Sequence, residues 1–105
     1  MHALAALVLA LASPAGVDRT TCAGSVSFAR TKTIVLVLRG TTCAEAKRVV
    51  RAYDRGSPAR PWVCFLTHAP FTRIDGKVVG FSCARGGTRG DIRKWPHAFL
   101  GLVAR

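Results

Sequence analysis

Four cysteines, spread at nearly even intervals, constrain the fold of this chain more than any other feature. Consecutive cysteines lie 21, 21 and 19 positions apart, and no Cys-x-x-Cys pair occurs among them. This spacing disfavours a structural zinc site, whereas an even number of cysteines is typical of small secreted domains held together by disulfides. We therefore predict two disulfides, and the three pairings that four cysteines allow remain open. The residues concerned are Cys22, Cys43, Cys64 and Cys83.

The first fifteen residues have the pattern of a secretory signal peptide. Residues 3–12 form an unbroken apolar run without a charged side chain. The run is too short to span a bilayer, but it has the length of a signal-peptide core. Small residues allow cleavage after Ala15, which we prefer, or after Ala12. Residues 16–105 then form a single secreted domain, because the chain is too short for a second hydrophobic core.

The predicted mature domain is strongly basic. The chain contains 16 Lys and Arg against 5 Asp and Glu, which gives a formal net charge of +11, and all of these residues lie at or after Asp18. Such a charge favours solubility and attraction to polyanions. Export disfavours nucleic acid as the partner, so we expect an anionic cell-surface polymer or lipid. The domain is expected to be a monomer.

The clearest local pattern is the start of a helix. Thr42 can cap the first turn, and Glu45, three residues later, can complete a capping box. The pattern predicts a helix over residues 43–55 that ends at Gly56. The expected buried face consists of Cys43, Ala46, Val49, Val50 and Tyr53. The basic residues Lys47, Arg48, Arg51 and Arg55 are expected to face solvent.

Several apolar runs predict short strands. Residues 25–30 alternate, residues 34–38 form a continuous aliphatic run, and residues 62–66 and 77–83 flank a connection that ends in Asp75-Gly76. The last two runs are expected to be antiparallel neighbours. Residues 98–103 fit a short strand or a helix. The predicted fold is therefore α+β: a small antiparallel sheet of three to five strands, one main helix packed across it, and two disulfides.

Few residues in the chain are suited to catalysis. Glu45 is explained by capping and Asp75 by its turn, which leaves little for a paired-carboxylate site. His68 and His97 are the remaining candidates for a base, but the sequence identifies neither a nucleophile nor an orienting acid beside them. We predict that the protein is not an enzyme and that it has no cofactor and no metal.

Basic residues on the helix and near the C-terminus are the best candidates for a binding site. An aromatic side chain among cations is suited to polyanions, because it adds stacking to charge. The alternative is a solvated basic face with Trp95 in the core, and Trp62 is predicted to pack beside Cys64. The candidate residues are Lys47, Arg48, Arg51, Arg55, Arg85, Arg89, Arg93, Lys94 and Trp95.

The order of these motifs resembles that of a group of small secreted actinobacterial proteins of unknown function. The shared pattern is Ser or Thr, then Cys, two variable residues, Ala and a basic residue, followed by Trp-x-Cys and a final strand that contains Cys. Here it corresponds to residues 42–47, 62–64 and 78–83. The resemblance covers most of the predicted mature domain, and it implies an exported disulfide-bonded domain without transferable catalytic residues.

A weaker likeness is to the subtilisin-inhibitor-like family, whose secreted members have a similar size and two disulfides in an α+β sandwich. It rests on Cys43 at the start of a helix, on Cys64 after a further strand, and on the Asp75-Gly76 turn before the final cysteine. The chain departs from that family because its first two cysteines lie further apart and its last two are closer together. The likeness implies, as the alternative function, a protease-inhibitor-like protein with a reactive loop at residues 68–73.

Overall fold

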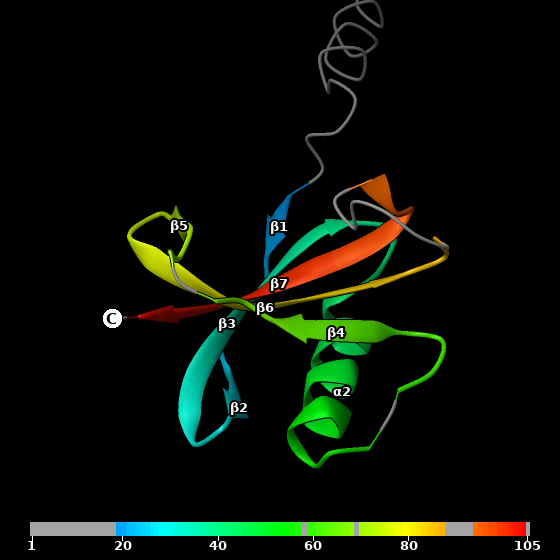
Figure 1. Cartoon of the computed structure of the whole chain (residues 1–105), viewed down its shortest axis with the longest axis horizontal. Coiled ribbons are helices and arrows are strands. Elements are labelled where there is room, and N and C mark those ends of the chain that lie inside the picture. Colours follow the sequence, from blue (N-terminus) through cyan, green and yellow to red (C-terminus); the bar gives the residue numbers. More distant parts are fainter. Residues whose placement is uncertain (1–18, 58, 69, 88–93, 105) are drawn as a thin grey trace, which may run out of the picture.

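Residues 19–57, 59–68, 70–87 and 94–104 are described by the computed structural model of this protein. The elements are β1 (Thr20–Thr21), β2 (Val26–Phe28), β3 (Thr31–Arg39), α2 (Cys43–Asp54), β4 (Val63–Leu66), β5 (Arg73–Ile74), β6 (Lys77–Arg85) and β7 (His97–Ala104). Within these residues a single helix packs on one face of a seven-stranded antiparallel sheet (Figure 1). The predicted α+β fold is confirmed. The predicted signal peptide lies outside the described residues.

Three long strands form the centre of the sheet. The strand order is β1-β3-β7-β6-β4, with β2 paired to β3 and β5 paired to β6. The predicted number of strands was too low because β1, β2 and β5 have only two or three residues, too few to show a hydrophobic period. Residues 98–103 belong to strand β7, whose backbone bonds to β3 on one side and to β6 on the other.

Two tight turns hold the hairpins of the sheet. The β2–β3 hairpin turns at Ala29 and Arg30, with φ of 52° and 65°, and the β5–β6 hairpin turns at Asp75 and Gly76, with φ of 52° and 77°. Two consecutive positive φ values are characteristic of the type I′ turn, whose twist matches that of the strands. The backbone N–H of Ala29 donates to Asp54 Oδ1 at 2.8 Å, which connects the first hairpin to the end of α2.

The start of α2 follows the predicted capping pattern in part. The Thr42 hydroxyl accepts a hydrogen bond from the Glu45 N–H at 3.1 Å, as an N-cap does. The Glu45 carboxylate accepts from the hydroxyl of Thr41 at 2.5 Å, so its hydrogen-bond partner differs from the one that a capping box predicts. The helix ends at Asp54, and Gly56 follows with a φ of 76°.

The two disulfides are Cys22–Cys43 and Cys64–Cys83, and none of the described cysteines is free. Cys22 lies beside β3, because its N–H donates to the Val35 carbonyl at 2.9 Å. The first disulfide therefore joins the start of α2 to the sheet, as predicted for Cys43. The second joins directly opposite residues of β4 and β6, which are antiparallel neighbours as predicted.

The face of the sheet that α2 covers, here called the covered face, contains the main hydrophobic core. Phe81 and Phe99 are fully buried there, and Trp62 lies with its ring centroid 5.2 Å from that of Phe99, which confirms that Trp62 is a core residue. Gly101 is required beneath Phe81, because a β-carbon at this glycine would lie 2.3 Å from the ring. The helix contributes Ala46, Val49 and Val50.

The opposite face, here called the open face, is also apolar. Its cluster centres on Leu36, Val79 and Leu102, and the partly buried residues packed against it are Ile34, Leu38, Ile74 and Leu100. No described helix lies over this face; β1 and the β5 hairpin rise beside it in Figure 1. The continuous aliphatic run of β3 explains the arrangement, because successive residues of a strand point to opposite faces.

Strand β4 forms one edge of the sheet. It pairs with β6 on one side only, and its outer side is unpaired among the described residues. Three of its four side chains are large, apolar and exposed: Val63 at 40%, Phe65 at 48% and Leu66 at 54%. The cross-strand disulfide at Cys64 therefore anchors an edge strand that has little hydrophobic burial of its own.

Candidate polyanion-binding surface

Three arginines on the outward face of α2 are the most exposed part of the predicted basic stripe. Arg48, Arg51 and Arg55 are all exposed, because the buried residues of the helix occupy its opposite face. Arg51 lies in the last turn and Arg55 at the C-cap, where positive charge complements the helix dipole. These two arginines therefore have a structural role as well as a candidate binding role.

Lys47, the fourth residue of the stripe, is held by the neighbouring loop. Its Nζ donates to the Ala23 carbonyl at 2.5 Å, and its side chain is half-buried. The bond joins α2 to the segment that follows Cys22, close to the first disulfide. Lys47 therefore contributes charge to this surface from a fixed position and is less available to a ligand than the arginines.

Arg85 lies over an aromatic ring, but the ring is that of Trp62. The guanidinium carbon of Arg85 is 5.4 Å from the centroid of the Trp62 ring, a cation–π contact. The sequence suggested Trp95 as the aromatic partner of this cation and gave no sign of Trp62. Counting outward from the Cys64–Cys83 pair brings residue 62 opposite residue 85, but the sequence left that pairing open and so did not give this register.

Glu45 lies between the two groups of predicted basic residues. Its Oε2 is 3.7 Å from Arg48 Nη2. The pKa of Glu45 lies below its usual range, mainly because the carboxylate accepts a hydrogen bond from the Thr41 hydroxyl. Burial raises the pKa, whereas Trp62, Arg85 and Arg48 lower it further. The buried indole N–H of Trp62 lies outside hydrogen-bond geometry, so we assign the effect chiefly to Thr41. The carboxylate offsets part of the positive charge here.

The remaining C-terminal candidates are described only in part. Arg89 and Arg93 lie outside the described residues, and Lys94 is exposed. Trp95 is half-buried against Gly87, where an added β-carbon would lie 2.3 Å from the indole ring. The contacts of Trp95 are therefore at least partly structural.

The two histidines proposed as bases have different surroundings. His97 is tied to the end of β3, because its Nδ1 shares a hydrogen bond with the Gly40 carbonyl, and His68 is exposed. A carbonyl accepts only, so Nδ1 of His97 carries the proton. In the described part of the chain, no group of three or more His, Cys, Asp or Glu side chains is arranged to hold a metal ion.

The described helix does not have the length and hydrophobicity needed to cross a membrane. Compared with protein-family models, with curated proteins and with solved structures, the chain matches none.

Proposed function

We propose that this protein is a secreted, non-enzymatic binding domain that attaches to anionic polymer or lipid at the cell surface through the exposed arginines of α2. The observation that carries the proposal is the exposure of Arg48, Arg51 and Arg55 on one helix face of a chain with a net charge of +11. The two disulfides favour the same setting, because such bonds persist in oxidising compartments.

The energetics favour a binding mode that depends on salt. A basic residue close to an anionic lipid surface contributes about 1 kcal/mol, and screening weakens this within a Debye length of about 10 Å at 0.1 M salt. Arg48 forms an ion pair with Glu45, so Arg51 and Arg55 are expected to contribute most to binding. Lys47 and Arg85 are held by other contacts and are expected to contribute less.

The test is binding of the oxidised protein to phosphatidylglycerol vesicles and to poly(glycerol phosphate) across a salt titration. The double variant Arg51→Gln/Arg55→Gln should bind the vesicles about 30-fold more weakly, which corresponds to about 2 kcal/mol. The matched control, Arg30→Gln/Arg60→Gln, removes the same charge from two exposed positions outside α2 and should bind nearly as the unmodified protein does. Equal losses in both variants would show that net charge, not this helix face, determines binding.

Protease inhibition is a second candidate, because one connection of the sheet is anchored at both ends. The Thr67 N–H donates to the Gly80 carbonyl at 3.0 Å, and the Val79 N–H donates to the Thr72 carbonyl at 2.9 Å. Between them Phe71 is 48% exposed, as an inhibitor's contact residue would be. Stoichiometric inhibition of a protease that prefers aromatic residues, lost in Phe71→Ala, would favour this function over surface binding.

A further inference from the structure

We propose that the open face of the sheet contains a binding site for a long-chain fatty acid, with the carboxylate at Arg19 and the alkyl chain along the apolar groove. This site is separate from the surface proposed above, since α2 packs on the other face of the sheet. The inference therefore does not rest on polyanion binding by the helix.

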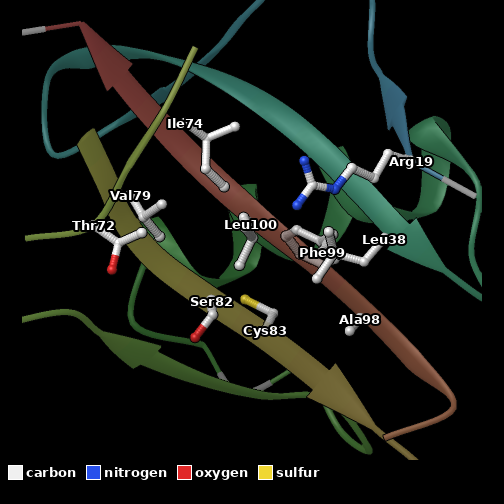
Figure 2. Close-up of a pocket in the computed structure, with 10 residues that line it drawn as sticks. All are labelled: Arg19, Leu38, Thr72, Ile74, Val79, Ser82, Cys83, Ala98, Phe99 and Leu100. Carbon is white, nitrogen blue, oxygen red and sulfur yellow. The ribbon is translucent and has the colours of Figure 1, made fainter. Parts of the chain in front are cut away.

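The groove has the size and composition of a small-ligand site. Its volume is about 500 Å³, within the range of about 300–1,000 Å³ that is usual for ligand pockets. Its walls are mainly apolar, and Ser82 and Thr72 supply hydroxyl groups on one side. Figure 2 shows these side chains, with Leu100 near the middle, Ile74 to its upper left and Leu38 to its right.

Arg19 supplies the charge of the groove. The pairing of Thr20 with Val37 places Arg19 next to Leu38 as the register continues, and Arg19 lines the groove. In Figure 2 its guanidinium points inward over the strands. Among the residues that the structure describes, no carboxylate lines this groove, and none lines a second cavity, where Lys32 and Lys77 lie near Ile34. An apolar strip with cations toward both ends attracts an amphipathic anion.

Other occupants fit these features less well. A second copy would bring another chain with a net charge of +11 against Arg19, which is repulsive. The apolar residues 3–12 of this chain contain no acid to pair with Arg19. A fatty acid matches both parts of the site, because a carboxylate pairs well with a guanidinium and each buried methylene adds apolar burial.

The experiment is calorimetric titration of the oxidised protein, in the form that an expression host secretes, with octanoate, decanoate and dodecanoate below their micelle concentrations. We expect one site per chain and an affinity that rises about 15-fold for each two methylenes added. Dodecanol should bind at least tenfold more weakly than dodecanoate, and dodecyltrimethylammonium should not bind in the groove.

Two variants test the groove directly. Arg19→Gln should weaken dodecanoate at least tenfold and leave dodecanol unchanged, because it removes only the charge. Ser82→Phe should weaken the binding of both ligands, because the ring fills the groove. If Ser82→Phe does not fold, Arg19→Gln still tests the groove, because Arg19 is exposed. Arg51→Gln removes the same charge from α2 and is the matched control, which should bind dodecanoate normally.

Four outcomes would overturn the proposal. These are no saturable binding, equal affinity for the anionic and cationic ligands, an Arg19→Gln variant that binds dodecanoate normally, and a dimer in sedimentation that excludes dodecanoate. The last would assign the open face to a second copy. Because Arg51→Gln/Arg55→Gln should keep dodecanoate binding while losing vesicle binding, failure of one proposal is distinguishable from failure of the other.

Discussion

The two faces of the sheet are made by the same three long strands, yet in the part of the chain that the structure describes only one of them has a helix against it. On the covered face Val35, Phe81 and Phe99 are completely buried. On the open face Leu36, Val79 and Leu102 are buried, but Leu38 and Leu100 around them remain partly exposed. The covered face therefore supplies most of the hydrophobic stabilisation. The open face retains apolar surface that a ligand can still bury, so stability and binding reside largely on different side chains.

The largest expected effect comes from removing a large buried side chain from the covered face. Phe81→Ala should lower the free energy of unfolding by about 3–5 kcal/mol, because it removes a fully buried ring. Leu38→Ala on the open face should cost about 1 kcal/mol or less, because its side chain is only partly buried. Urea unfolding with the disulfides intact measures both. Similar losses at the two positions would mean that the faces are equally important for stability.

Removing the disulfide that holds the helix should have the next largest effect. Cys22→Ala/Cys43→Ala should lower the free energy of unfolding by about 3 kcal/mol, because the disulfide closes a segment with a separation of 21 residues. Cys64→Ala/Cys83→Ala is the matched control with a similar separation of 19 residues. Hydrogen exchange should show local opening of α2 in the first variant alone. Equal opening in both would contradict the assignment of the first disulfide to the covered face.

A smaller effect is expected where a glycine makes room for the core. Gly101→Ala should cost about 1–3 kcal/mol, because the added β-carbon overlaps the ring of Phe81 on the covered face. Leu100→Ala, one residue earlier on β7 and on the open face, should cost less. Thermal unfolding of the two variants compares them. If the order were reversed, packing on the open face would be the tighter of the two.

The smallest expected effect concerns the attachment of the helix by its first turn. The folded-state pKa of Glu45 is lowered, chiefly by the Thr41 hydroxyl, so the ionised carboxylate stabilises the fold at pH values above the pKa that it has in the unfolded chain. Glu45→Gln should therefore cost less than about 1 kcal/mol at neutral pH. The difference should disappear as the pH falls through the folded pKa.

Unfolding measured across pH, with Thr41→Val as a second variant, checks this assignment. Thr41→Val should remove most of the pH-dependent contribution of Glu45, because it removes the main hydrogen bond to the carboxylate. A Glu45→Gln difference that persists unchanged in acid would attribute the effect to packing instead of charge.

Features carried by local sequence could be predicted, and those that depend on strand register could not. The cap at Thr42, the turn at Asp75-Gly76 and the presence of two disulfides follow from residues within a few positions of each other, or from a count of cysteines. The residues at the Ala29-Arg30 turn do not indicate a turn of this kind, because neither residue favours a positive φ.

The candidate sites show the same division. Periodicity predicted that the arginines of α2 face solvent, and the structure agrees. Periodicity could not predict the contact of Arg85 with Trp62. That contact depends on how β4 and β6 pair, and this register is seen only when Cys64 is known to bond to Cys83. The groove at Arg19 was also not predicted. It lies beside β1 and β5, which have only two residues each and give no pattern in the sequence.

The pairing of the cysteines bears on how the chain matures. Each disulfide joins cysteines that are consecutive in the sequence, first Cys22 with Cys43 and then Cys64 with Cys83. During synthesis the N-terminal part of a chain emerges first, so the first pair is available before the second pair has emerged. Oxidation in that order yields the native pairing directly, and we expect the native disulfides to form with little need for isomerisation.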